Sequence, residues 1–351
     1  MKRIKVLIVD DSALVRDILE KGLSLDKEIE VVGKAADVYS ARDKIVFLEP
    51  DVLTLDVEMP RMDGVEFLRR LMPQYPLPVV MVSSMTKNGS KVTLDALDAG
   101  AVDFVLKPSV KIGAGLNEMM EELREKVKNA STIDVSRWKN SKPLKIRENQ
   151  NKSSILHNST DKVIAIGAST GGTIALTKII NEFPPDIPGT VIVQHMPPVF
   201  TKMFAEKLNQ TSSVEVKEAE NNDRIITGRV LIAPGGYHLE VVRSGGYYIA
   251  QIFEGEKVNG HTPSVDVLFN SVAKNVGSNA IGLLLTGMGK DGAGGLLNMR
   301  NSGARTFSQD EASSVVFGMP MEAFKIGASE KQINLKDVNN ALLKTIEEMR
   351  K

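Results

Sequence analysis

The sequence predicts an α/β protein with two consecutive domains, each built around a parallel sheet. The chain has 351 residues, 42% of them hydrophobic and 25% charged, which is enough for two separate cores. In both halves short apolar runs alternate with amphipathic stretches, a pattern typical of strand–helix–strand units. A polar, aperiodic segment near the middle separates the halves and predicts a linker.

The first half, residues 1–129, contains five such strand–helix units. Its apolar runs, rich in β-branched residues, are Ile4–Val9, Ile29–Lys34, Val52–Asp56, Pro78–Ser83 and Val102–Lys107. The amphipathic stretches are Ala13–Leu23, Ser40–Leu48, Gly64–Met72, Lys91–Ala99 and Leu116–Asn129. Strands this short, joined by helices, need right-handed crossovers and therefore predict a doubly wound (βα)5 domain.

Residues 130–161 lose this periodicity and are mostly polar, so they are expected to form the linker. Residues 162–351 form the second predicted domain. Its apolar runs are Val163–Ile166, Val191–Val193, Val230–Ile232 and Ile281–Leu285. Its helical patterns are Ile174–Glu182, Phe200–Asn209, Val265–Val276, Leu296–Ser302 and the amphipathic Val338–Met349. Two apolar stretches around a glycine turn, residues 238–253, predict a β-hairpin inserted into this α/β sheet.

Composition excludes several classes of protein. Lys+Arg and Asp+Glu are equal at 44 each, which argues against nucleic acid or an anionic membrane as partner. The absence of cysteine excludes disulfides, thiolate metal sites and a cysteine nucleophile. No apolar run reaches the ~20 residues of a membrane span, and the N-terminal run is too short for a signal peptide. We therefore expect a cytoplasmic protein without membrane insertion.

Five polar residues fall at predicted strand ends in the first half. Asp10 and Asp11 follow the first strand, Asp56 ends the third, and Ser83 and Lys107 close the fourth and fifth. Ligands of open parallel sheets bind at the carboxyl ends of the strands. Clustered carboxylates favour a Mg²⁺ ion, and a Mg²⁺-bound Asp56 can attack a phosphoryl donor. Lys107 and the Ser83 hydroxyl would then stabilise the added charge.

The second half carries a candidate serine nucleophile. Residues 167–171, Gly-Ala-Ser-Thr-Gly, match G-x-S-x-G between a predicted strand and a helix, which exposes Ser169 on a tight turn. Such a serine needs a base and an orienting acid. Of the four histidines, His195 ends the next strand, and Asp291 follows the strand 281–285. The chain order Ser, His, Asp differs from that of α/β-hydrolases, so that fold is not predicted.

Two other output functions stay open on the residues alone. The first is nucleotide binding: residues 287–292 match G-x-G-x-x-G, and Asp310 follows at about the sequence separation expected of an acid that binds the ribose. This motif comes late in its domain, whereas a dinucleotide-binding fold normally opens with it. The second alternative is that the second half binds DNA or protein. Against it, this half shows no helix-turn-helix pattern. Labelling of Ser169 by a fluorophosphonate would separate a hydrolase from both alternatives.

The first half resembles a response-regulator receiver domain. The resemblance rests on residues 9–12 (Val-Asp-Asp-Ser), 55–60 (Leu-Asp-Val-Glu-Met-Pro), 63–64 (Asp-Gly), 82–84 (Val-Ser-Ser) and 106–108 (Leu-Lys-Pro). It implies that Asp56 accepts phosphate from a histidine kinase, and that Asp10 and Asp11 help to hold Mg²⁺. It also suggests that Phe104, three positions before Lys107, is a switch residue.

The second half resembles the catalytic domain of the CheB methylesterases. The resemblance rests on residues 166–172 (Ile-Gly-Ala-Ser-Thr-Gly-Gly), 194–197 (Gln-His-Met-Pro), 233–236 (Ala-Pro-Gly-Gly), 263–266 (Pro-Ser-Val-Asp) and 286–292. It implies hydrolysis of γ-glutamyl methyl esters on chemoreceptors with release of methanol, and in some members deamidation of receptor glutamines. The backbone amides of Thr170 and Met288 would form the oxyanion hole, and no cofactor is expected for this reaction. The same resemblance implies that phosphorylation relieves a restraint that the receiver imposes.

Overall fold

The computed structural model describes residues 2–84, 87–107, 114–136 and 161–349. The chain divides into two compact units, Met1–Lys145 and Ile146–Lys351, and each is described by itself. Most of the predicted linker, together with His157, lies outside the described residues. In the part of the chain that is described, no helix is both long and apolar enough to span a membrane.

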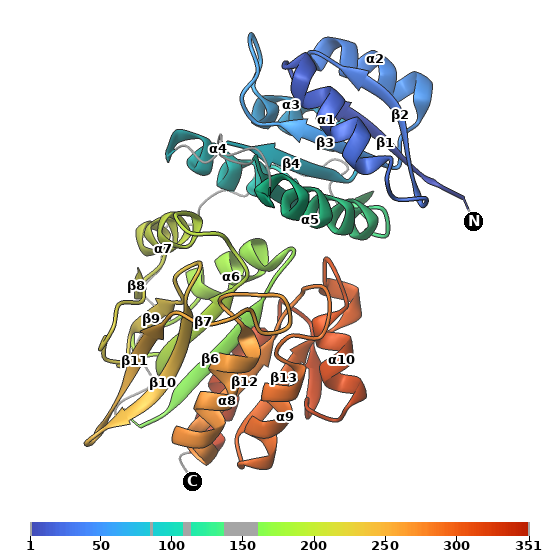
Figure 1. Cartoon of the computed structure of the whole chain (residues 1–351). Helices are drawn as coiled ribbons and strands as arrows, with labels where there is room; N and C mark the ends of the chain where they lie inside the picture. Colours follow the sequence, from blue (N-terminus) through green and yellow to red (C-terminus); the bar gives the residue numbers. More distant parts are fainter. Residues whose placement is uncertain (1, 85–86, 108–113, 137–160, 350–351) are drawn as a thin grey trace. The chain divides into compact units, whose positions relative to one another are not determined.

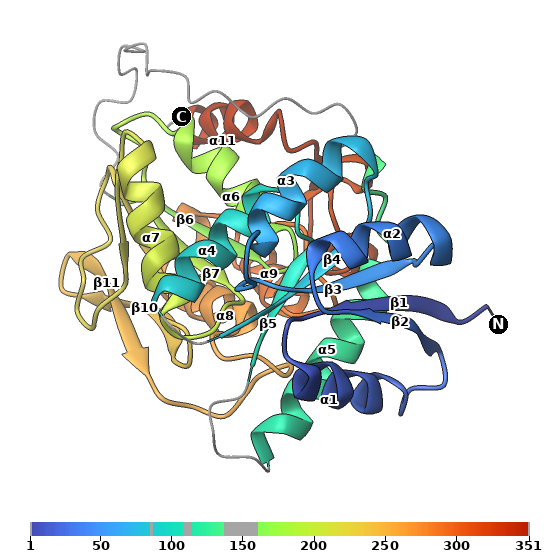
Figure 2. The same cartoon turned by 90° about the horizontal axis from the view of Figure 1, so that it is seen from above.

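The first unit is a five-stranded parallel sheet with helices on both faces (Figures 1 and 2). Its elements in order are β1 (Ile4–Val9), α1 (Ala13–Leu23), β2 (Ile29–Ala35), α2 (Val38–Leu48), β3 (Val52–Asp56), α3 (Gly64–Gln74), β4 (Val79–Ser83), α4 (Lys87–Asp98), β5 (Asp103–Leu106) and α5 (Ala114–Ala130). The strand order is β2-β1-β3-β4-β5. The order reverses between β1 and β3, which makes their carboxyl ends the expected ligand site.

Three of these helices, α1, α2 and α3, have a side-chain cap at their N-terminus. Ser12, Asp37 and Asp63 each precede a helix, and their oxygens accept from backbone amides of the first turn at 3.4, 2.8 and 2.7 Å. Such caps satisfy amides that have no partner within the helix. Strands β3 and β4 are buried along their whole length, as expected of central parallel strands. The predicted doubly wound domain is confirmed.

The second unit is a seven-stranded parallel sheet with the order β14-β13-β12-β6-β7-β9-β8. In chain order its first elements are β6 (Val163–Ala168), α6 (Gly172–Asn181), β7 (Gly189–Gln194), α7 (Phe200–Thr211), β8 (Glu215–Glu218) and β9 (Arg229–Ile232). Then follow β10 (His238–Ser244), β11 (Tyr247–Phe253), α8 (Val265–Asn275), η2 (Gly277–Asn279), β12 (Ala280–Leu284), α9 (Ala293–Asn301), β13 (Arg305–Gln309), η3 (Glu311–Ser313), α10 (Met319–Lys325), β14 (Lys331–Ile333) and α11 (Val338–Glu348).

Helices cover both faces of this larger sheet as well. Helices α8 and α9 bury Phe269, Val272 and Leu296 against strands β6, β7 and β12. Helices α6 and α7 contact each other, and α11 lies beside α6, where the Asn339 side-chain amide donates to the Ile179 carbonyl at 3.2 Å. The chain order of the strands reverses between β12 and β6, so ligand binding is expected at the carboxyl ends of these central strands.

The predicted hairpin is confirmed as a separate two-stranded sheet, β10–β11, with antiparallel pairing from His238 to Phe253. It packs on α8, where the Ser271 hydroxyl accepts from the Val241 amide at 2.8 Å and Asn275 donates to the Val241 carbonyl at 2.9 Å. The hairpin therefore supports the helix on its outer side.

Several elements were not predicted from the sequence. Strands β8, β13 and β14 and helix α10 have no counterpart among the predicted elements, and α4 begins at Lys87 rather than at residue 91. β8 reads Glu-Val-Lys-Glu and β14 has three residues, so neither contains an apolar run. Pairing with a neighbouring strand, β9 for β8 and β13 for β14, defines these strands, and a single-sequence pattern does not record pairing.

Candidate active site and phosphoacceptor site

The three predicted catalytic residues follow three adjacent central strands. Ser169 comes directly after β6, His195 directly after β7, and Asp291 lies in the loop between β12 and α9. β6 pairs with β7 on one side and with β12 on the other. The site therefore lies at the order reversal of the seven-stranded sheet.

Glycine allows the sharp turn that carries Ser169. Gly171 has φ +78°, a left-handed conformation, and a Cβ there would come within 2.4 Å of the Val315 side chain. Gly167 lies under helix α8, and a Cβ on it would come within 2.2 Å of the Val265 side chain. The two glycines of the G-x-S-x-G motif thus have different roles, one in the turn and one in close packing.

The loop after β12 is bonded to the serine turn. The Ser169 amide donates to the Thr286 carbonyl at 3.0 Å, and the Thr286 hydroxyl donates to the Thr170 carbonyl at 2.9 Å. Gln194 donates its side-chain amide to the Ser169 carbonyl at 3.0 Å. A Cβ on Gly287 would stand 2.8 Å from the Ser169 Cβ, so the loop passes directly beside the serine.

His195 is held from two directions. Its backbone amide donates to the carbonyl of Ala168, the residue before the serine, at 3.1 Å. Its Nε2 lies 2.8 Å from Asp291 Oδ2. When Nε2 carries the proton, Nδ1 is the ring nitrogen with a lone pair, and it has no hydrogen-bond partner among the described residues. That nitrogen can accept a proton.

The Asp291 carboxylate is 2% exposed and accepts from five donors. Besides His195 at Oδ2, these donors are the Val265 amide (2.7 Å), the Ser264 hydroxyl (2.8 Å), Asn259 Nδ2 (2.9 Å) and the Asp266 amide (3.2 Å). The amides of Val265 and Asp266 open helix α8, whose N-terminus favours an anion. Burial alone would raise the pKa of Asp291, but the hydrogen bonds and the His195 charge lower it below its usual range.

The two residues that the resemblance assigns to the oxyanion hole lie on the two bonded loops. Thr170 directly follows the serine, and Met288 lies two residues beyond Thr286. Gly318 approaches so closely that a Cβ on it would stand 3.1 Å from the Met288 Cα. Met288 thus belongs to the packed loop beside Ser169, and its role as an amide donor stays a prediction.

The geometry of the 287–292 loop differs from that of a nucleotide-binding loop. The Gly287 carbonyl accepts from the amides of Gly318 and Met319, and the Asp291 side chain turns inward to α8. Asp310, the candidate ribose ligand, instead caps η3, accepting from the Ser313 amide at 3.0 Å and from Asn334 Nδ2 at 3.0 Å. These contacts favour the triad over the nucleotide alternative.

Four further residues contact the proposed triad, and the sequence did not predict these contacts. His261 stacks on His195, with ring centroids 3.8 Å apart and planes 12° apart. Asn259, Ser264 and Gln194 bind the triad residues or their backbone. The segments of Gln194 and Ser264 were noted as motifs, but Asn259 was not, because its contact depends on a turn rather than on a strand end.

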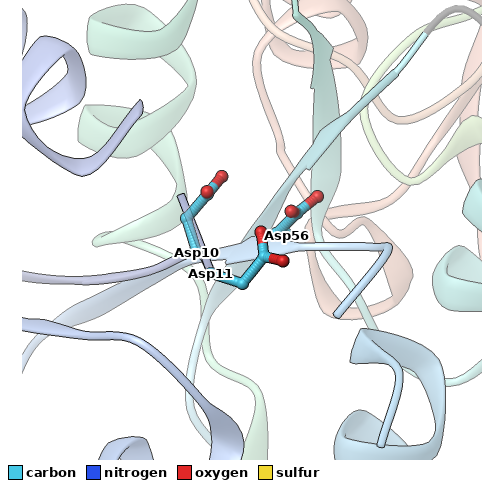
Figure 3. Close-up of side chains that lie close together, drawn as sticks. All are labelled: Asp10, Asp11 and Asp56. Carbon is cyan, nitrogen blue, oxygen red and sulfur yellow. The ribbon is translucent and has the colours of Figure 1, made fainter. Parts of the chain in front are cut away.

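The first unit brings its three predicted acids together. One carboxylate oxygen each from Asp10, Asp11 and Asp56 lies within 4.8 Å of the others. Figure 3 shows the three side chains at the ends of β1 and β3. Asp10 and Asp56 are buried and Asp11 is exposed. An all-oxygen set of this size fits Mg²⁺, which prefers carboxylate and water ligands.

Lys107 forms ion pairs with two of these acids. Its Nζ lies 2.8 Å from Asp10 Oδ2 and 2.9 Å from Asp56 Oδ2. Burial raises the pKa of Asp56 to about 6, against the opposing effect of the lysine. Burial would lower the pKa of Lys107, but the two carboxylates outweigh it and raise that pKa. The site is therefore a desolvated carboxylate beside a firmly charged ammonium group.

Ser83 lies at the end of β4, as predicted, and its side chain is buried. Its hydroxyl accepts from the Thr93 hydroxyl at 2.7 Å and lies 3.3 Å from the Ser84 carbonyl. Phe104 on β5 is also buried, and Lys126 donates to its carbonyl at 2.6 Å. The support that Ser83 would give to a phosphoryl group stays a prediction.

Comparison with known proteins agrees with both halves. The family described as "CheB methylesterase" matches residues 164–342, and the family described as "Response regulator receiver domain" matches residues 6–131. A protein-glutamate methylesterase/protein-glutamine glutaminase of Syntrophotalea carbinolica is 60% identical over 352 residues, 99% of each chain. The chain belongs to the CheB methylesterase family.

Other members of the CheB methylesterase family are also similar over most of their length. A relative of the same name from Sulfurimonas denitrificans is 55% identical over 328 residues, 93% of each chain. The crystal structure of the Thermotoga maritima CheB methylesterase catalytic domain matches with a TM-score of 0.52 and 36% identity, covering 53% of this chain and all of that one. The predicted family and fold are thereby confirmed.

Proposed function

We propose that the chain is a protein-glutamate methylesterase that hydrolyses γ-glutamyl methyl esters of chemoreceptors and is activated by phosphorylation of Asp56. The chain is a carboxylic ester hydrolase of its family and carries a receiver domain. The observation that carries the proposal is that Ser169, His195 and Asp291 follow three adjacent strands, with His195 bound to Asp291 at 2.8 Å. We further propose domain boundaries at 1–129 and 162–351, with 130–161 as linker.

The proposed reaction begins with attack of the Ser169 hydroxyl oxygen on the ester carbonyl carbon. His195 takes the hydroxyl proton at Nδ1, since Nε2–H is engaged with Asp291. Collapse of the tetrahedral adduct breaks the ester C–O bond, and His195 returns the proton to the leaving methoxy oxygen. Methanol departs, and the acyl group stays on Ser169.

Water then completes the cycle. It gives a proton to His195 and attacks the acyl carbon. Collapse of this second adduct breaks the bond between the acyl carbon and the Ser169 oxygen, His195 returns the proton to that oxygen, and a glutamate side chain is the product. The Thr170 and Met288 amides are our candidates for stabilising the oxyanion in both steps. Attack on a glutamine side chain would follow the same steps with ammonia as leaving group, so we include receptor deamidation in the proposal.

Control is proposed to lie in the first unit. Asp56, desolvated and paired with Lys107, is the phosphoacceptor. Asp10, Asp11 and Asp56 would hold a Mg²⁺ ion, which supplies charge neutralisation for phosphoryl transfer. Lys107 and Ser83 would then contact the added phosphoryl oxygens. The ester hydrolysis itself needs no cofactor, because the nucleophile, base and acid are side chains of this chain.

The proposed partners are a chemotaxis histidine kinase as phosphodonor and methyl-accepting chemoreceptors as substrate. The match to the receiver-domain family supports the first, and the match to the CheB methylesterase family supports the second. Neither partner calls for nucleic acid or membrane insertion. We propose that the protein meets both partners in the cytoplasm.

The test is methanol release from a methylated chemoreceptor fragment, measured with and without acetyl phosphate and Mg²⁺. We expect release by the wild type, stimulation by acetyl phosphate, and covalent labelling of Ser169 by a fluorophosphonate. Ser169→Ala is the matched control for both readouts. Release by the Ser169→Ala protein at the wild-type rate would refute the proposed nucleophile.

A further inference from the structure

A tight turn contacts both His195 and Asp291, the hydrogen-bonded pair of the proposed triad that is called the dyad below. Val258 and His261 exchange two backbone hydrogen bonds, both 3.0 Å, and enclose Asn259 and Gly260. Both central residues have positive φ, +53° and +84°. An Asn-Gly pair with two positive φ values is the preferred form of the two-residue hairpin turn, because both residues tolerate that backbone. The local sequence therefore specifies this turn.

The first side chain of the turn binds the proposed orienting acid. Asn259 Nδ2 donates to Asp291 Oδ1 at 2.9 Å and to Asp266 Oδ2 at 2.7 Å. The other oxygen of Asp266 accepts from the Gly295 amide at 2.6 Å. Burial, together with the Asp291 charge, raises the pKa of Asp266. The amide group of Asn259 thus lies between two carboxylates and fixes their separation.

The last residue of the turn contacts the proposed base. The His261 ring stacks on the His195 ring with 3.8 Å between centroids and 12° between planes. The hydrogen bond from Nε2 to Asp291 fixes one edge of the His195 ring, and the stack restricts rotation of its plane.

The base of the turn is itself held in place. His238, which is buried, accepts from the Ser264 amide at Nδ1 (3.3 Å), and its Nε2 lies 2.9 Å from the Glu256 carbonyl. With Nδ1 as acceptor, Nε2 is the donor to that carbonyl. His238 therefore joins the chain just before the turn to the start of α8, whose amides bind Asp291. His238 thus holds in place both the turn and the helix start that binds Asp291.

We propose that the Val258–His261 turn positions the dyad, with Asn259 holding the Asp291 carboxylate and His261 setting the plane of the His195 ring. The inference rests on the proposed function, because it assumes His195 as base. Asn259 and His261 are positioning residues, since neither is placed on the reacting atoms. This single turn places the exposed Asn-Gly pair and a second histidine at the site.

The test uses the full chain with five variants: Asn259→Ala, Asn259→Asp, His261→Ala, His261→Phe and, as matched control in the same segment, Lys257→Ala, whose side chain is exposed. Two rates are measured across pH, the labelling of Ser169 by a fluorophosphonate and kcat/KM for ester hydrolysis. Thermal unfolding reports the folded fraction of each variant. Besides Asp291 itself, the titratable groups near His195 are His261, which stacks on it, and Asp266, with His238 behind Ser264.

Asn259→Asp adds a negative charge beside Asp291, which stabilises protonated His195. We therefore expect the acid limb of both rates to move to higher pH, by about one unit. Asn259→Ala removes a donor and is expected to lower both rates about tenfold. His261→Ala should lower them roughly three- to tenfold, whereas His261→Phe keeps a stacked ring and should stay within about threefold of wild type.

Two results would overturn the inference. One is wild-type rates and pH profiles in both alanine variants. The other is activity lost only in proportion to unfolded protein, with an unchanged acid limb, which would make the turn merely structural. In either case Ser169 labelling in the wild type leaves the proposed function standing. Failure to label Ser169 in the wild type would instead refute the proposed function itself.

Discussion

Replacing Asp291 by asparagine removes a charge but keeps the shape of a side chain that five donors surround. An amide offers one acceptor oxygen, so an NH₂ group must face one of the two donor sets. If the oxygen stays near Ser264 and Asn259, the NH₂ group faces the Val265 amide and His195 Nε2. His195 would then accept at Nε2 and carry its proton at Nδ1, which is the wrong tautomer for a base at Nδ1.

The size of the loss follows from this tautomer change. The corresponding substitution in serine-protease triads lowers kcat by about 10⁴, and we expect roughly 10³–10⁴ here. Stability should fall as well, because the Val265 amide is left buried without an acceptor, at a cost of about 1–3 kcal/mol. For a domain of this size, each kcal/mol lowers the thermal midpoint by about 2–4 °C.

The assay is steady-state methanol release by purified Asp291→Asn, with unfolding followed by circular dichroism. Asp310→Asn is the matched control, since Asp310 also caps a short helix with its carboxylate but lies outside the proposed triad. It should lose stability and keep its rate. Adding His195→Gln to Asp291→Asn should cost little more than the worse single change. A rate within tenfold of wild type, or additive losses in the double variant, would refute the reasoning.

The pH dependence of stability gives the same substitution a second readout. The pKa of Asp291 is lowered in the fold from an unfolded value near 3.8, so the folded state binds fewer protons. Its stabilisation is complete above that value and is lost as the pH falls below it. The difference in midpoint between wild type and Asp291→Asn should therefore be largest near pH 7 and shrink below about pH 4. A difference that grows on acidification would contradict the lowered pKa.

Four further predictions concern other parts of the chain. Ser169→Ala should abolish hydrolysis, by several orders of magnitude, with an unchanged unfolding midpoint. Asp56→Asn should lose Mg²⁺-dependent phosphate uptake from acetyl phosphate but keep basal hydrolysis; stoichiometric labelled phosphate in this variant would place the acceptor elsewhere. A fragment of residues 155–351 should exceed the unphosphorylated full chain in methanol release and should not respond to acetyl phosphate, and a fragment no faster than that full chain would exclude restraint by the receiver. Gly171→Ala should lower the unfolding midpoint, since alanine at φ +78° costs about 1–2 kcal/mol and its Cβ meets Val315.

The sequence predicted the first domain almost completely, because its strands are short apolar runs and its helices are amphipathic stretches between them. The run Val52–Asp56 was predicted with the bounds that β3 has, and so was Ala13–Leu23 for α1. Its chemistry was equally accessible, since a parallel sheet brings all carboxyl strand ends to one edge. Asp10, Asp11 and Asp56 could be grouped by that rule alone. The contact of Lys107 with both Asp10 and Asp56 needed coordinates.

The second domain was less predictable, for a physical reason that differs by element. Strand β13 reads Arg-Thr-Phe-Ser-Gln, yet four of its five residues are buried, because pairing with β12 satisfies its backbone and its small polar side chains pack inside. The triad could be predicted from strand ends. Asn259 and His261 could not, because a two-residue turn brings them to Asp291 and His195, and nothing in the spacing of residues 258–261 indicates where that turn points.

Strand β8 is polar, and for that reason the hydrophobic pattern did not predict it. The same polarity affects how readily the catalytic unit aggregates in concentrated solution. β8 and β14 are the two edges of the seven-stranded sheet, where unpaired backbone groups could recruit a strand from another molecule. β8 is four residues long and carries Glu215, Lys217 and Glu218, and β14 is three residues long and begins with Lys331. Short, charged edges of this kind resist strand addition, because a second copy would have to bring like charges together and bury them. The sheet can therefore keep its apolar strands central, with the catalytic loops at their ends, and still present borders that discourage aggregation.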